Sequence, residues 1–138
     1  MTKADMTALA ERLEAAAGDG ADLFWEAFRL TQASNDPATF VRASQRFGEL
    51  IDAKAFESAA MLLVPEGYVL SLNATSDDEK RRHTGDIPLS DWIAMLIRQE
   101  HCGYKIDFRG HCRHGCAATP PLALAAAAIR ARASQEDE

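Results

Sequence analysis

The chain has no excess of positive charge, and this limits the partners that we expect for it. Its 138 residues hold 15 lysines and arginines against 21 aspartates and glutamates, so the formal net charge is -6 with histidine neutral. Proteins that bind nucleic acids through the phosphates present a basic surface. The charge balance therefore argues against a nucleic-acid partner and permits a protein partner.

Long apolar stretches and export signals are missing as well. A helix that spans a bilayer needs roughly 20 apolar residues, and the uncharged run near the C-terminus, Leu122–Ile129, is too short for this. The first residues, Met1–Met6, do not lead into the apolar core of a signal peptide. We therefore expect a cytoplasmic protein without membrane association, whose three cysteines are free or bound to metal.

Motifs of the common enzyme classes are absent from the sequence. There is no glycine-rich phosphate loop and no serine-centred nucleophile elbow, which favours a non-enzymatic role without catalytic residues. Double-stranded RNA-binding modules share the order of elements predicted below for the second half of the chain. They carry basic residues at the start of their last helix, whereas this chain has Thr119–Leu122 there, so we also reject RNA binding.

The first half of the chain has the spacing of amphipathic helices. Apolar residues three and four positions apart predict a first helix over 4–17, which ends at Gly18–Gly20. A second helix is predicted over 21–34. Asp36 followed by Pro37 is typical of a helix start, and the apolar pattern then continues to Val64 as one helix or as two.

The pattern changes to alternation after Gly67. Tyr68, Leu70 and Leu72 share one face of a predicted strand. Residues 90–99 fit a strand or a short helix, and we favour the strand because two strands alone make a marginal sheet. The third predicted strand is Tyr104–Arg109. Its charged face is a candidate partner-binding surface formed by Lys105, Asp107 and Arg109.

The predicted C-terminal helix is rich in alanine. Thr119 can cap it, prolines 120 and 121 suit its first turn, and no charge occurs from Leu122 to Ile129. A helix that is apolar on every side is buried on more than one side. The covering surface can come from this chain or from a second copy, so a homo-oligomer is an open alternative.

Together these elements predict an α+β fold with N-terminal helices, a three-stranded antiparallel sheet and a buried, alanine-rich C-terminal helix. At this length we expect one domain over 1–138. Its parts are a helical region over 1–65, a layer of strands and helix over 66–133 and an acidic tail over 134–138.

The densest group of reactive side chains lies in a predicted loop before the last helix. His111, Cys112, His114 and Cys116 are residue types that bind zinc, although their spacing matches no standard zinc signature. Cys102 is excluded as a ligand of the same zinc ion, because the predicted strand between it and Cys112 is about 20 Å long. One alternative is a loop with a buried thiol, and another is a thiolate–imidazole pair of Cys112 with a neighbouring histidine.

Two short motifs carry a resemblance to a known family. The turn Leu63–Tyr68, with the sequence Leu-Val-Pro-Glu-Gly-Tyr, and the helix start Ala118–Leu124 resemble those of small phage and prophage proteins of the ABA-sandwich type. The early stretch Arg12–Ala16 is also similar. The chain departs from the family in an insertion over 75–89 and in its cysteine–histidine cluster. The resemblance implies a phage or prophage origin, a bacterial host cytoplasm and an accessory role such as countering host defences.

These observations lead to three functional hypotheses. The first is a non-enzymatic phage accessory protein that binds another protein, for example as an inhibitor of a host defence system. The second is a protein that sequesters a small ligand or nucleotide. The third is a zinc-binding protein or metal-dependent enzyme that uses the cluster over His111–Cys116.

Overall fold

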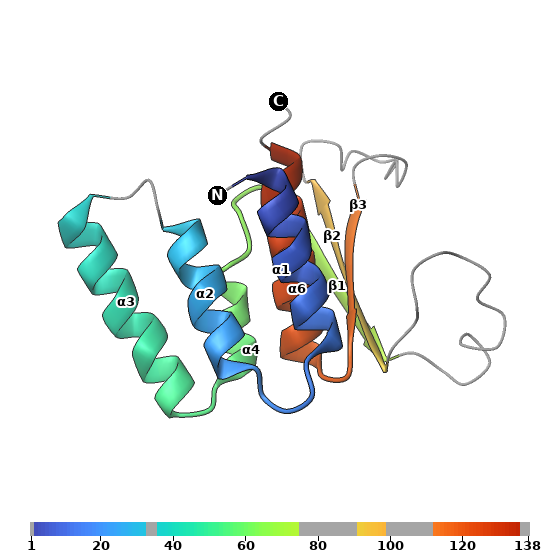
Figure 1. Ribbon diagram of the computed structural model, residues 1–138, viewed down its shortest axis with the longest axis horizontal. Coiled ribbons are helices and arrows are strands. Elements are labelled where there is room, and N and C mark those ends of the chain that lie inside the picture. Colours follow the sequence, from blue (N-terminus) through green and yellow to red (C-terminus); the bar gives the residue numbers. More distant parts are fainter. Residues whose placement is uncertain (1, 33–35, 75–90, 99–111, 136–138) are drawn as a thin grey trace, which may run out of the picture.

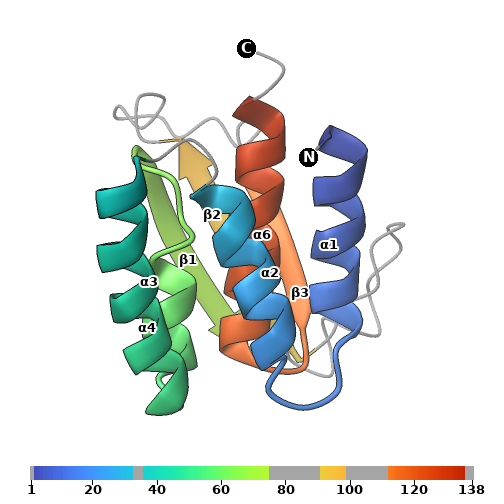
Figure 2. The ribbon, with the colours of Figure 1, turned by 60° about the vertical axis from the view of Figure 1, so that its left-hand side comes forward.

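The protein has the predicted α+β architecture, and the helices that the structure describes lie on one side of an antiparallel sheet. The computed structural model describes residues 2–32, 36–74, 91–98 and 112–135. Within these residues, five helices lie to one side of a three-stranded sheet (Figures 1 and 2). The C-terminal helix α6 lies directly against the sheet, with α1 and α4 beside it, and α3 is outermost (Figure 1).

The first two helices begin within one residue of the predicted starts and end two and three residues before the predicted ends. Helix α1, Lys3–Ala15, starts with a capping box in which the Thr2 hydroxyl and the Asp5 carboxylate each accept from the other's backbone N–H. Its stripe of Met6, Leu9 and Leu13 is buried, as predicted. Gly20 then adopts a left-handed φ of 70° and leads into α2, Ala21–Thr31.

The open question about residues 37–64 is resolved as two helices. Asp36 caps α3, Pro37–Asp52, by accepting from the Thr39 backbone N–H at 2.9 Å, which confirms the predicted start. A turn with Lys54 at φ 57° separates α3 from α4, Phe56–Met61. Helix α3 is held to α2 by aromatic contacts, including Phe28 stacked on Phe47 with ring centroids 4.5 Å apart.

The sheet is formed by β1, Tyr68–Ala74, β2, Trp92–Arg98, and β3, Cys112–Ala117, in the order β1-β2-β3. The strand prediction for residues 90–99 is therefore confirmed. The prediction that His111–Cys116 is a loop is wrong, since most of this segment is β3, paired antiparallel with β2. The predicted strand Tyr104–Arg109 lies outside the described residues.

Tertiary packing explains why β3 is extended although its sequence lacks β-branched residues. Gly115 faces α6 so closely that an added Cβ atom would lie 2.0 Å from the carbonyl oxygen of Ala123 and 2.6 Å from the nitrogen of Ala127. A glycine on the strand and alanines on the helix allow the two backbones to approach. The strand is thus selected by its neighbours more than by its own propensity.

Helix α6, Pro120–Gln135, is the centre of the core. Every residue from Leu122 to Ile129 is at most 1% exposed, and the helix contacts the strands β3 and β2 as well as α1 and α4. Of the two coverings left open for this helix, the structure shows cover by the same chain, and a homo-oligomer stays a prediction. The helix also extends into the region predicted as an acidic tail. No helix in the described ranges has the length and hydropathy of a bilayer span.

Candidate functional site

The two faces of the sheet differ, and their residues can be assigned from the strand register. Gly115 faces α6, and it pairs with Ala94, which pairs with Leu72 on β1. Because paired residues share a face and neighbours along a strand alternate, these positions and every second residue from them lie on the helix side. The remaining positions lie on the side where no described helix packs, and they form what we call the helix-free face: Val69, Ser71, Asn73, Ile93, Met95, Ile97, Cys112, His114 and Cys116.

The helix-free face has an apolar centre with polar residues beside it. The central strand contributes Ile93 and Met95, which are half-buried, and Ile97, which is buried. Beside them on β1, Ser71 accepts a hydrogen bond from the Asn73 side-chain amide at 2.9 Å. Val69 is 43% exposed. An apolar patch with a polar rim is the arrangement found at protein–protein interfaces.

The free edge of β3 is closed by two charged side chains from distant helices. The Cys116 backbone N–H donates to Glu14 Oε2 at 2.8 Å, and the His114 carbonyl oxygen accepts from Arg130 Nη1 at 2.9 Å. The two side chains also form a bidentate ion pair with each other. Edge strands expose N–H and C=O groups to which another chain can pair, and here Glu14 and Arg130 occupy such groups.

This arrangement also sets the charge states near β3. The hydrogen bond with Glu14 raises the pKa of Arg130 above its ordinary value, so the guanidinium stays charged. Burial lowers the pKa of His114, and the positive charges of Arg130 and Arg113 lower it further. His114 is therefore neutral at pH 7 and adds no positive charge to the helix-free face.

Three of the four predicted zinc ligands, Cys112, His114 and Cys116, lie along β3. Neighbours along a strand rise about 3.3 Å each, so the Cα atoms of Cys112 and Cys116 lie about 13 Å apart. Two cysteine ligands with Zn–S bonds of about 2.3 Å cannot bind one ion across that span. The four predicted ligands therefore cannot share one ion while β3 is extended. Among the described side chains no group of three metal-binding residues occurs, and zinc binding by a smaller set stays a prediction.

Several other predicted site residues lie outside the described part of the chain. These are His111 of the cluster and the proposed partner-binding residues Lys105, Asp107 and Arg109. The side chain of Cys112 also lies outside it, so its pairing with a histidine stays a prediction. Cys116 is buried, and a loop with a buried thiol was one of the alternatives for this cluster.

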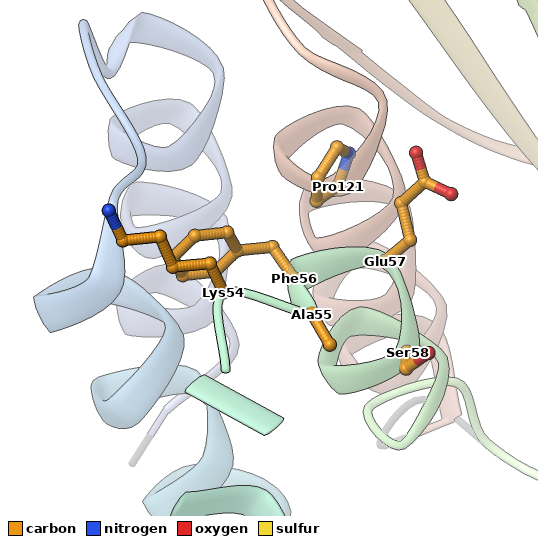
Figure 3. Close-up of a pocket in the computed structure, with 6 residues that line it drawn as sticks. All are labelled: Lys54, Ala55, Phe56, Glu57, Ser58 and Pro121. Atoms are coloured by element: carbon orange, nitrogen blue, oxygen red, sulfur yellow. The ribbon is translucent and has the colours of Figure 1, made fainter. Parts of the chain in front are cut away.

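A surface hollow at the start of α4 is the described feature that bears on the small-ligand hypothesis. Its volume is about 310 Å³, and it is lined by Lys54, Ala55, Phe56, Glu57, Ser58 and Pro121 (Figure 3). Ligand sites hold a few polar groups that converge on the bound molecule. Here the Lys54 and Glu57 side chains point in opposite directions (Figure 3). The charged groups diverge, so the hollow lacks the geometry of such a site.

Comparisons of the chain with protein-family models, with curated proteins and with solved structures found no match. The resemblance to phage proteins therefore stays a prediction, and the site rests on geometry. Reading the sequence alone missed the helix-free face and the pair of Glu14 with Arg130. The alternation of Ile93, Met95 and Ile97 was a signal for the face, since it marks a second apolar side on the strand that carries Ala94 and Leu96.

Proposed function

We propose that this protein is a non-enzymatic accessory protein, of phage or prophage type, that binds another protein through the helix-free face of its sheet. The observation that carries the proposal is the one-sided placement of the helices. All helices in the described ranges pack on the side of Gly115 and Ala94 (Figures 1 and 2), yet the other side of the central strand is also apolar.

The chemistry of the face supports a protein as the partner. Apolar side chains that stay partly exposed beside polar ones are found at protein interaction sites, and Val69, Ile93 and Met95 are such side chains. With His114 neutral and Ser71 and Asn73 uncharged, the described side chains at the centre and rim offer shape and hydrogen bonds in place of charge. The resemblance to phage proteins supports a component of a host defence system as the class of partner.

The test is capture from an extract of a bacterial host by three purified forms of the protein. Wild type is compared with Met95→Lys, which places a charge in the centre of the face. Val41→Lys is the matched control, because Val41 is 53% exposed on α3, far from the sheet (Figure 1). We expect one host protein to be recovered by wild type and by the control, and to be lost with Met95→Lys.

Two outcomes would contradict the proposal. One is recovery of the same host protein by Met95→Lys at the level of wild type, and the other is its loss with Val41→Lys alone. Circular dichroism and thermal unfolding check that each variant is folded. If Met95→Lys does not fold, Asn73→Glu replaces it, because Asn73 is an exposed residue of the same face.

A further inference from the structure

In the described part of the chain, the two edges of the sheet differ in the side chains that contact them. Among the described strands the order is β1-β2-β3, so β1 and β3 are the edges of this sheet. Glu14 and Arg130 occupy backbone groups on the outer side of β3. Proteins keep edge strands from pairing with charges, prolines, bulges or covering segments. The seven residues of β1, Tyr68–Ala74, contain no charged residue, no proline and no glycine.

The apolar side chains of β1 are also incompletely covered. Helix α6 lies over β3 and β2, and the main contacts of β1 are with β2. On the helix side, Leu70 and Leu72 are only partly buried, and on the other face Val69 is 43% exposed. A further strand placed beside β1 would cover part of these side chains and would pair with its outer N–H and C=O groups.

The sequence of β1 is suited to pairing with itself. In an antiparallel pair related by a two-fold axis through the middle residue, Ser71 faces Ser71 of the second copy, Leu70 faces its Leu72, and Val69 faces its Asn73. Leu70 and Leu72 lie on the helix side of the sheet, so the pair brings apolar side chains together. No like charges meet, and the residues that face each other lie on the same side of the sheet, as antiparallel pairing requires.

We propose that a second copy of this chain pairs with β1 antiparallel to its own β1, with the two-fold axis at Ser71, to form a continuous six-stranded sheet. The axis is perpendicular to the sheet, so the helices of both copies lie on the same face and the helix-free faces join into one surface. Because the β3 edges carry Glu14 and Arg130, the assembly ends at two copies.

The test is the molar mass of the full chain in solution, measured by light scattering across a dilution series. We expect wild type to approach twice the chain mass of 15.1 kDa. Ser71→Arg and Ser71→Asp each place like charges opposite each other at the axis, so either variant alone should weaken the dimer by at least about tenfold. An equimolar mixture of the two should restore it, because opposite charges then meet.

A wild-type protein that stays at the mass of one chain would overturn the proposal. This holds also if the β1 amides of that monomer are protected from hydrogen exchange, because another part of the same chain then covers the edge. A dimer that both variants leave unchanged, or that the mixture fails to restore, would overturn it as well. Thermal unfolding of each variant confirms that the fold is kept. This inference is independent of the proposed function, since capture of a host protein that depends on Met95 would stand with a monomer.

Discussion

Gly115 sets the distance between β3 and α6 at their closest approach. The atoms that an added Cβ would meet are the backbone atoms Ala123 O and Ala127 N, which cannot rotate away as a side chain can. Gly48 is a useful contrast, because a Cβ there would meet only the Trp25 ring, at an ordinary 3.5 Å. Replacing glycine with alanine is therefore expected to destabilise the protein at position 115 and not at position 48.

We predict that Gly115→Ala lowers the free energy of unfolding by about 3 kcal/mol or more, because the strand or the helix must shift to make room. The control Gly48→Ala lies within α3 and should be neutral or stabilising by up to about 1 kcal/mol, since alanine is the better helix former. Urea unfolding of the two variants and wild type measures both. Equal effects of the two substitutions would contradict the close approach.

Asp36 gives a second prediction at this scale, on pH. The backbone N–H and the hydroxyl of Thr39 lower the pKa of Asp36 below its ordinary value of 3.8. The folded state therefore favours the ionised carboxylate, and this stabilisation is present above pH 3.8 and is lost as the pH falls through the lowered folded-state pKa. Asp36→Asn keeps an acceptor for the cap but does not titrate.

The measurement is the stability of wild type and Asp36→Asn at neutral pH and at pH values below 3.8. We expect the difference between the two proteins to shrink as the pH falls, because wild type loses its charged cap and the variant has none to lose. A difference that does not change with pH would show that the cap on α3 does not depend on the charge of Asp36.

At the scale of elements, the pair of Glu14 on α1 and Arg130 on α6 closes one edge of the sheet. Their side chains are 17% and 23% exposed, whereas the pair of Arg12 and Glu26 is 56% and 38% exposed. Partly buried charges that also satisfy backbone groups are costly to leave without a partner. Exposed pairs contribute little, because water and salt screen them.

We predict that Glu14→Ala destabilises the protein by about 2–3 kcal/mol, since it leaves Arg130 uncompensated and the Cys116 N–H without its acceptor. The control Glu26→Ala should cost less than about 1 kcal/mol. Chemical denaturation at the same salt concentration compares the two. A loss at Glu26 as large as at Glu14 would contradict the role of the buried pair.

The elements that could be predicted from the sequence are those whose signals are local. The cap at Asp36 and the apolar stripe of α1 depend on residues within one or two turns, and both were placed correctly. Strand β3 was missed because its extended form depends on contact of Gly115 with α6. The closing of its edge joins Glu14 and Arg130, which are 116 positions apart, so no local pattern could reveal it.

At the scale of the whole molecule, the main feature is the difference between the two faces of the sheet. The helix side buries its residues completely at Ala94 and Leu96, and α6 is covered by a single chain. The other side keeps apolar residues at Val69, Ile93 and Met95 with partial exposure. Partly exposed apolar side chains on one face of a sheet are what a binding function would require.

The most direct test of this account is the affinity of the protein for the host protein that wild type recovers, measured by titration calorimetry with wild type, Met95→Lys and Val41→Lys. A hot-spot residue at the centre of an interface contributes about 2 kcal/mol or more, so Met95→Lys should raise the Kd by roughly thirtyfold if Met95 is such a residue. Val41→Lys should leave the Kd unchanged. An unchanged Kd for a folded Met95→Lys variant would contradict the claim that the helix-free face is the binding surface.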